Sequence, residues 1–242
     1  PLTLWSAESF LQTAKYRFLA ALAAALALHL LAGHYNLAFI ELLTVLLYTG
    51  LRLTFARRQL AVSLAARRRL AATTILLTLV VGFLLAAVQL LPTWQLKQRS
   101  QRANVGARHD PGYGHIPPWY LSQVVAPWLW YAPDVDADQA LNANKSWSIP
   151  SLTNKAEAHL YSGLIPFLLA IGGIIVRQLN GAGTPRVLWV WVILGLAALI
   201  YSTGWLLPLT RHLPGFNFFM GPGRYGIVTT LAVGLLAGYT LD

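Results

Sequence analysis

Residues 16–55, "YRFLAALAAALALHLLAGHYNLAFIELLTVLLYTGLRLTF", decide the fold class. The stretch holds two apolar runs, about Tyr16 to Gly33 and about Leu37 to Phe55. Each is close in length to the about 20 helical residues that cross a hydrocarbon core. The turn "GHYN" at 33–36 joins the runs, and its glycine can adopt a backbone conformation that ends a helix. We therefore expect a hairpin of two membrane-spanning helices.

The composition of the whole chain agrees with that expectation. Of the 242 residues, 56% are hydrophobic and 11% are charged, a balance that excludes an ordinary soluble globular domain. Further spans are predicted at about 70–91, 158–176, 187–204 and 225–242. The expected fold is all-α integral membrane, with about six transmembrane helices in a single membrane domain over residues 1–242. The chain has no cysteine, so it offers no thiolate chemistry and no disulfide framework.

The net charge of +10 does not indicate a nucleic-acid partner. The basic residues do not line one face or arm, as a phosphate-tracking surface requires. They lie beside the apolar runs, Arg52 among them, as the positive-inside rule describes for cytoplasmic flanks. The segment "ARRQLAVSLAARRRL" at 56–70 predicts an interfacial helix on an anionic leaflet, and the turn between Arg177 and Arg186 falls on the same side. Both ends of the chain are then cytoplasmic, and both are typical of cuts inside a longer chain.

Residues 93–157, between the third and fourth spans, are predicted to form a long extracytoplasmic loop. Pro92 is expected to end the span before it. The middle of the loop, "IPPWYLSQVVAPWLWYAPD" at 116–134, is rich in Trp and Tyr, which favour the headgroup level of a membrane. We expect short interfacial helices there, lying along the outer surface over whatever the spans enclose.

Two ionisable residues fall inside predicted spans, where a charge in lipid is costly. His29 and Glu41 lie on the two arms of the hairpin, on either side of the turn, so they could face each other. The pair either binds a proton or substrate or fastens the hairpin as a satisfied polar contact, and the second role is the commoner one. A haem or chlorophyll ligand role for His29 or His34 is a further alternative, which needs a partner that the sequence does not show.

Several polar side chains are predicted to face the outer surface. His34 and Asn36 present hydrogen-bonding groups in the "GHYN" turn, where a polar ligand head could be met; an ordinary helix end explains the turn equally well. Glu157 and His159 stand at the start of the fourth span. Two residues apart on a helix, they do not share a face, and Glu157 also suits a first turn, where the helix dipole stabilises an acid.

Arg224 begins the sixth span, directly after Gly221, Pro222 and Gly223. Free backbone N–H groups at this helix start would converge with the guanidinium and form an anion site. Snorkelling to the interface explains a single arginine as well. Elsewhere, "DVDAD" at 134–138 starts like a calcium loop but lacks the glycine and the glutamate that such a loop needs. No metal site and no cofactor are predicted.

Several stretches, taken together, resemble the YfhO family of bacterial membrane proteins. They occur in the order and approximate spacing of that family, over nearly the whole chain. The stretches are "LLAGHYN" (30–36), "LLAAVQLLPTWQL" (84–96), "GYGHIPPWYL" (112–121), "EAHLYSGLIPFLLA" (157–170), "HLPGFNFFMGPGRYG" (212–226) and "LLAGYTLD" (235–242).

The resemblance implies a membrane glycosyltransferase of the GT-C type. Such a protein takes a sugar from a polyprenyl-phosphate carrier and transfers it to a cell-envelope acceptor on the outer face of the bacterial cytoplasmic membrane. His34, Asn36, Glu157, His159 and Arg224 would line the donor cavity, with Arg224 neutralising the carrier phosphate and Glu157 contacting a sugar hydroxyl. The implied partners are membrane lipids and the polyprenyl-phosphate sugar donor.

Two departures from the family leave open whether the chain is an enzyme. The catalytic acid of GT-C enzymes lies on an outer loop near the N-terminus, which places it outside this chain, so no catalytic residue is assigned. Met220 stands where a basic residue is expected after "LPGFNFF". The alternative is a non-catalytic structural or accessory subunit that packs against partner membrane subunits in a larger complex.

Overall fold

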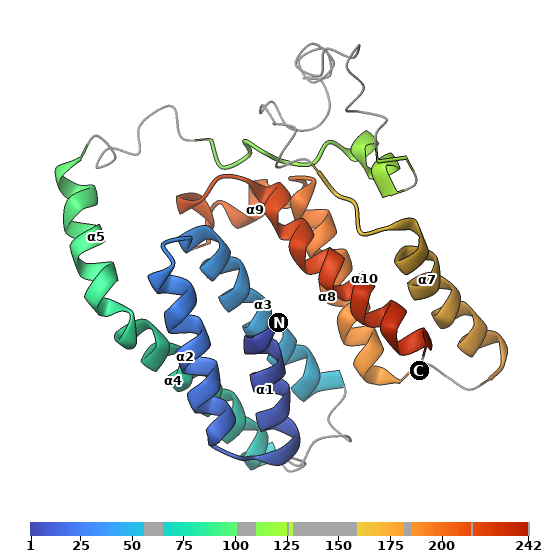
Figure 1. Cartoon of the computed structure of the whole chain (residues 1–242), viewed down its shortest axis with the longest axis horizontal. Helices are drawn as coiled ribbons and strands as arrows, with labels where there is room; N and C mark the ends of the chain where they lie inside the picture. Colours follow the sequence, from blue (N-terminus) through green and yellow to red (C-terminus); the bar gives the residue numbers. More distant parts are fainter. Residues whose placement is uncertain are drawn as a thin grey trace, which may run out of the picture. The chain divides into compact units, whose positions relative to one another are not determined.

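The computed structural model describes residues 1–55, 65–100, 110–124, 126–127, 159–181, 185–213 and 215–241; for residues 65–68, 70 and 217 it describes the backbone alone. Over these ranges the fold is all-α, and none of these residues forms a strand (Figure 1). The all-α class predicted from the apolar runs is therefore confirmed. The chain forms two compact units, Pro1–Gly106 and Ala107–Asp242.

The helices of the first unit pack around α2. The described helices of this unit are α1 (Leu2–Thr13), α2 (Arg17–Leu31), α3 (Tyr35–Phe55), α4 (Ala65–Leu85) and α5 (Ala87–Arg99). α2 packs along α4 and against α1, and α1 also contacts α3 (Figure 1). Gly82 allows α4 to approach α2 closely, because a Cβ at this position would lie 3.0 Å from Leu26 Cδ2. The helix α1 was not among the predicted elements.

The predicted hairpin corresponds to α2 and α3. Gly33 connects the two helices with φ +81°, a conformation that residues with a Cβ rarely adopt. The glycine of "GHYN" is therefore required by the turn.

The third predicted span is bent. The helix axis turns by 65° between Ala71–Leu85 and Ala87–Arg99. Pro92 lies inside α5, so the prediction that it ends a helix is wrong. Its ring disfavours a straight helix through the preceding turn, and the chain bends upstream of it instead of stopping. The loop boundary at 93 is also wrong, because residues 93–99 are helical, and residues 65–70 of the predicted interfacial helix form the first turns of α4.

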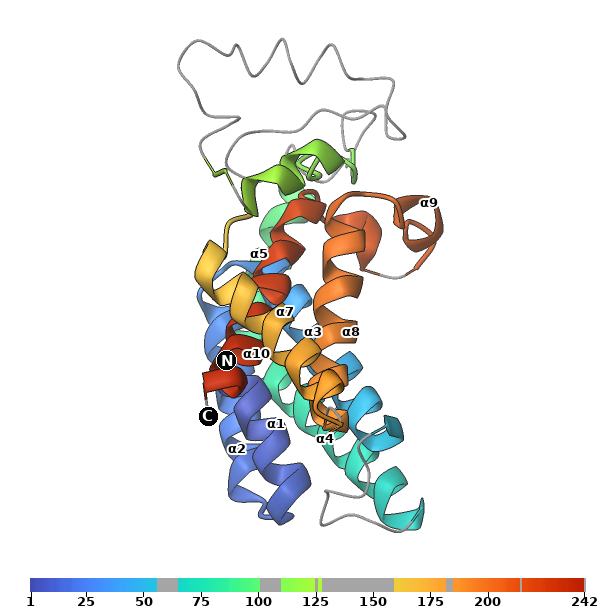
Figure 2. The same ribbon diagram turned by 90° about the vertical axis from the view of Figure 1, so that its right-hand side faces the viewer.

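The second unit is built on α10 (Gly226–Leu241), which packs against α7 (Leu164–Leu179) and α8 (Arg186–Ser202) (Figure 2). Its shorter helices are α9 (Leu207–Thr210) and the 3-10 helices η3 (Pro118–Val124), η4 (Phe216–Phe218) and η5 (Pro222–Tyr225). α8 and α10 approach closely, since a Cβ at Gly195 would lie 2.9 Å from Ala232 Cβ. Thr229 Oγ1 donates a hydrogen bond to Gly195 O at 3.0 Å across the same contact.

Among the described helices, α3, with 21 residues and a mean hydropathy of 1.6, is long and apolar enough to cross a membrane, a property that core helices of soluble proteins can share. Ala71–Leu85 and Ala87–Arg99 together would give a second membrane-crossing segment if they are counted as one bent span. α2, α7 and α8 are apolar but shorter. A helix lies in each of the six predicted apolar runs, the fourth beginning only at Leu164, but by length and composition at most two membrane crossings are found among the described residues.

Candidate functional site

Residues 110–124, here called the cap segment, form the first candidate site element. Asp110 Oδ1 accepts a hydrogen bond from Gly112 N at 2.8 Å, which closes a turn after which the chain reaches η3. Gly114 has φ +82° and provides the next change of direction. A short helix was expected over these aromatic residues, and η3 confirms it for 118–124. Trp128, Trp130 and Tyr131 lie outside the described residues.

Backbone hydrogen bonds tie the cap segment to the turn before α10. Gly221 N donates to Tyr113 O at 2.8 Å, and Gly223 N donates to Gly114 O at 3.0 Å. Gly221 has φ +84°, a conformation that favours glycine and turns its N–H toward the cap segment. The two segments are far apart in sequence, so the tertiary fold creates this contact.

The cap segment also binds the end of α8 and the chain that leads to α7. Ile116 N donates to Ser202 O at 2.8 Å. Gln123 is fully buried, and its Oε1 accepts a hydrogen bond from Leu160 N at 3.1 Å. Ile116, Tyr120 and Leu160 are buried together in one core cluster. The cap segment is therefore bonded to three other segments of the second unit: the turn before α10, the end of α8 and the chain before α7.

Arg224 lies in η5 immediately before α10, and its side chain is exposed. The sequence predicted that free N–H groups of the preceding turn would converge with its guanidinium. That part of the prediction is wrong, because Gly221 and Gly223 donate their N–H groups to the cap segment and Pro222 has none. The N–H of Arg224 itself donates to Gly221 O at 3.1 Å. The turn thus carries an exposed arginine on a backbone that these hydrogen bonds fix.

His159 is exposed, and the residue after it, Leu160, is buried. A Cβ at Gly226 would lie 3.1 Å from Leu160 Cδ1, so the chain around Leu160 packs against the first residue of α10. His159 and Arg224 therefore come from segments that the structure brings together at one end of the second unit.

Glu157 lies outside the described residues. The helix that follows it begins at Leu164, with Gly163 at its N-cap, so the predicted place of Glu157 in the first turn of that helix is wrong. The glycine has φ +91° and separates the non-helical residues 159–162 from the helix.

His115 is a buried titratable group in the cap segment that the sequence interpretation did not single out. Its side chain is 7% exposed, and Nδ1 lies 3.1 Å from Gly112 O. Burial lowers the pKa of the imidazole below its usual value, because desolvation disfavours the charged form; the backbone acceptor at Gly112 and the charge of Asp110 oppose this shift. His115 is accordingly a neutral hydrogen-bonding group near pH 7.

His34 and Asn36 belong to the first unit, at the turn between α2 and α3. His34 is exposed and Asn36 is half-buried. The neighbouring Tyr35 hydroxyl donates to Thr93 Oγ1 at 3.1 Å and ties the turn to α5. These two candidates therefore lie in a different unit from the other described candidate residues.

The predicted contact between His29 and Glu41 is confirmed. His29 Nδ1 pairs with Glu41 Oε2, and Thr3 Oγ1 donates to Glu41 Oε1 at 2.6 Å. Each carboxylate oxygen has a partner, one on α2 and one on α1. The arrangement joins α1, α2 and α3, as the hairpin-fastening interpretation expects.

A second ionic cluster in the first unit was missed from the sequence. Arg52, which is 1% exposed, donates from Nε to Glu8 Oε2 at 2.8 Å and pairs through Nη2 with Glu8 Oε1. The Tyr48 hydroxyl donates to Glu8 Oε2 at 2.9 Å, and Gln12 Nε2 donates to Oε1 at 2.7 Å. Arg52 is therefore a buried, paired residue and not an exposed charge at a helix end. The spacing of Glu41, Tyr48 and Arg52 on one face of a helix was the available signal.

In the part of the chain that the structure describes, no group of three or more His, Cys, Asp or Glu side chains could hold a metal ion. The polar clusters of the first unit are instead closed by their own hydrogen bonds and ion pairs. The exposed groups at the end of the second unit, near the cap segment, are thus the best candidates for meeting a ligand.

No family model matches this chain, and neither a curated protein nor a solved structure matches it. The resemblance to the YfhO family accordingly rests on the sequence stretches quoted above.

Proposed function

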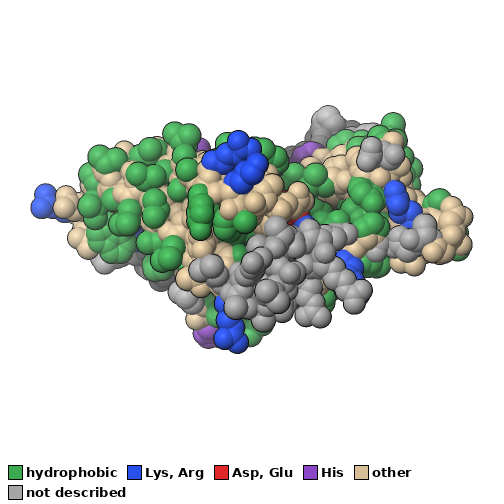
Figure 3. Space-filling view, turned by 90° about the horizontal axis from the view of Figure 1, so that it is seen from below, with side chains coloured by type: hydrophobic (Ala, Val, Ile, Leu, Met, Phe, Trp, Pro, Cys, Tyr) green, Lys and Arg blue, Asp and Glu red, His purple; other side chains and the backbone are tan. Residues whose placement is uncertain are grey.

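We propose that the chain is a multi-span domain of the bacterial cytoplasmic membrane, with both ends on the cytoplasmic side. Large apolar side chains are exposed along the helices; Leu77 is 59% exposed, Leu84 67% and Ile165 72%. Hydrophobic side chains cover much of the face seen in Figure 3. Water-soluble monomers rarely expose apolar surface on this scale, whereas lipid-facing helices do so as a rule.

Within that membrane domain, the proposed function is part of a YfhO-like glycosyltransferase that uses a polyprenyl-phosphate sugar donor. The observation that carries it is the presentation of Arg224. Its guanidinium is exposed on a turn that backbone hydrogen bonds fix to the cap segment, beside the chain that carries His159. A cation held this way at the outer end of a membrane domain suits a lipid phosphate.

The chemistry asked of Arg224 is stabilisation of the leaving group. In the transfer, the bond between the anomeric carbon and the carrier phosphate breaks, and a bond to the acceptor hydroxyl forms. The departing phosphate gains negative charge, which a planar guanidinium can neutralise through two parallel N–H donors. The acceptor proton goes to a catalytic carboxylate of the kind that the resemblance implies, for which no residue of this sequence is assigned. His159 is the described side chain best placed to contact the sugar.

The test replaces Arg224 with alanine in the full-length protein and measures turnover of the sugar lipid in membranes. We expect a loss of about a hundredfold or more, the size reported for removing one group that stabilises developing charge. Arg224→Lys should recover only part of the rate, because an ammonium lacks the two-pronged geometry. Arg211→Ala, at another exposed arginine of the same unit, is the matched control. Unchanged turnover in Arg224→Ala at normal expression contradicts the phosphate role.

The second candidate function is a structural or accessory subunit. Two observations favour it: Met220 replaces the expected basic residue, and the amides of Gly221 and Gly223 are already bonded within the fold. Purification in mild detergent separates the two functions. A stoichiometric membrane partner without bound sugar lipid supports the accessory role, and bound sugar lipid contradicts it.

A further inference from the structure

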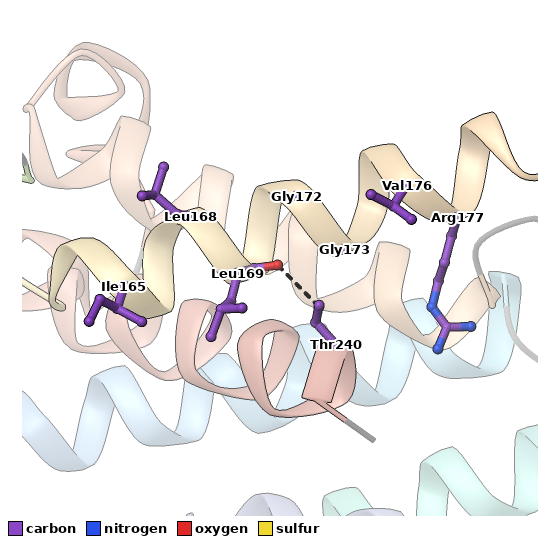
Figure 4. A pocket seen from close by; sticks show the side chains of 8 residues that line it. All are labelled: Ile165, Leu168, Leu169, Gly172, Gly173, Val176, Arg177 and Thr240. Carbon is purple, nitrogen blue, oxygen red and sulfur yellow. Dashed lines mark hydrogen bonds between the residues drawn. The ribbon is translucent and has the colours of Figure 1, made fainter.

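An apolar groove lies between α7 and α10 in the second unit, away from the candidate residues above. Its volume is about 460 Å³, and it runs along α7 from Ile165 to Arg177 with Thr240 of α10 beside it (Figure 4). With a rise of 1.5 Å per residue, this part of α7 is about 18 Å long. Leu168 and Val176 in its wall are 57% and 54% exposed.

Two adjacent glycines create the groove. Gly173 lets α10 approach, because a Cβ there would lie 2.8 Å from Thr240 Cβ, and the Thr240 hydroxyl donates to Leu169 O at 3.1 Å. At Gly172 a Cβ would meet no atom within 4 Å. Gly173 thus allows the two helices to pack closely, while Gly172 leaves the space that a side chain would fill open to the surroundings.

One end of the groove carries a positive charge. Arg177 lies in the last turn of α7, and its guanidinium carbon stands 4.6 Å from the centre of the Tyr239 ring. Stacking on an aromatic face holds the guanidinium plane and leaves its N–H edges available to an oxygen ligand. By the topology predicted from the basic flanks, this end of α7 is on the cytoplasmic side.

We propose that this groove binds an anionic glycerophospholipid of the cytoplasmic leaflet, with one acyl chain along α7 and the phosphodiester on Arg177. The inference rests on the membrane arrangement proposed above and is independent of the transferase activity. The apolar wall cannot select among lipids, since all lipid chains are as apolar as leucine. The headgroup charge decides the selection, as it does in other basic pockets between helices on the cytoplasmic side.

The experiment measures which lipid the purified protein retains. The chain is extracted in mild detergent and offered equal amounts of phosphatidylglycerol and phosphatidylcholine with identical acyl chains, and native mass spectrometry counts the bound lipids. We expect phosphatidylglycerol to be retained about five- to tenfold over phosphatidylcholine, since one basic residue near an anionic headgroup contributes about 1 kcal/mol. Equal retention of the two lipids overturns the proposal.

Two pairs of variants test the two parts of the site. Arg177→Gln should abolish the preference for phosphatidylglycerol, whereas Arg186→Gln, an exposed arginine at the start of α8 outside the groove, should keep it. Gly172→Leu fills the groove and should reduce the retention of both lipids. Gly234→Leu is its control, because that position on α10 also faces open space and lies outside the groove.

If Arg177→Gln and Arg186→Gln lose the preference for phosphatidylglycerol equally, the effect is one of diffuse charge and the groove site is overturned. Normal lipid retention in Gly172→Leu would overturn it as well. Circular dichroism checks that each variant is folded. The lipid ratio is measured without any sugar donor, so equal retention of the two lipids would leave the transferase proposal standing. Conversely, a failed transferase assay would leave the expected lipid ratio unchanged. A protein that stays in solution without detergent would overturn the membrane arrangement and this inference together.

Discussion

The guanidinium of Arg52 illustrates what a charged group needs when it is removed from water. A buried ion pair gains little over well-packed apolar residues, but breaking it by removing one partner leaves an uncompensated charge. Both oxygens of the Glu8 carboxylate accept hydrogen bonds, two of them from Arg52. The cluster therefore joins α1 to α3 through Arg52 and Tyr48.

We predict that Arg52→Met destabilises the first unit by about 3–5 kcal/mol, because Glu8 loses its cation in a half-buried site. The double variant Glu8→Gln with Arg52→Met should recover a large part of that loss. Thermal and denaturant unfolding in detergent measure both effects. Arg17→Met, at an exposed arginine, is the control. If the free energy of unfolding of Arg52→Met differs from that of the parent protein by no more than about 0.5 kcal/mol, a structural role for the pair is contradicted.

The buried imidazole of His115 predicts a pH dependence. Its pKa is lowered in the folded protein, so below its usual value of about 6.5 the unfolded chain binds a proton that the folded chain does not. The free energy of unfolding of the second unit should therefore fall as the pH drops from 7.5 through 6. His115→Gln should flatten this dependence, whereas His212→Gln, at an exposed histidine, should not. An identical pH profile in His115→Gln refutes the assignment.

At the scale of helices, adjacent positions of α7 have opposite requirements. A Cβ at Gly173 would overlap the Thr240 side chain, whereas a Cβ at Gly172 would meet nothing. Gly173→Ala should destabilise the packing of α7 on α10 by about 1–3 kcal/mol, the usual cost of overpacking. Gly172→Ala should be neutral or slightly stabilising, because alanine favours a helix more than glycine does. Thermal unfolding in detergent compares the two variants; equal effects would show that the contact does not limit stability.

The helices themselves could be predicted from the sequence, but their ends and partners could not. Apolar runs of the right length mark α2, α3, α7, α8 and α10. The bend at Ala86 escaped the sequence because Pro92 was taken as a stop, although a proline can also leave a helix bent. The pairing of Glu8 with Arg52 joins residues 44 positions apart; the spacing on α3 places Arg52 on a polar face but does not identify Glu8 as its partner.

For the candidate site, the sequence located Arg224 and His159 near one end of the spans but assigned the wrong partners to the turn. The glycines before Arg224 suggested an anion-binding backbone, and their amides instead bind Tyr113 and Gly114. Backbone-to-backbone contacts between distant segments carry no side-chain signature, so reasoning from residue types could not foresee them.

At the scale of the whole molecule, the membrane topology can be tested cleanly because the chain contains no cysteine. Tyr161 and Arg186 lie on either side of α7 and are both exposed in part. In intact cells, a membrane-impermeant maleimide should label Tyr161→Cys from outside and should reach Arg186→Cys only after permeabilisation. Labelling of both positions from outside would contradict the proposed topology.

The attachment of the cap segment has a consequence for how the protein is made. Its acceptors, Tyr113 and Gly114, leave the ribosome before α7 and α8, and their donors, Gly221 and Gly223, follow only after those helices. Contacts between distant segments form late, because the intervening chain must first be ordered. The end of the second unit that carries the cap segment should therefore stay open during synthesis and close only when the turn before α10 has been made.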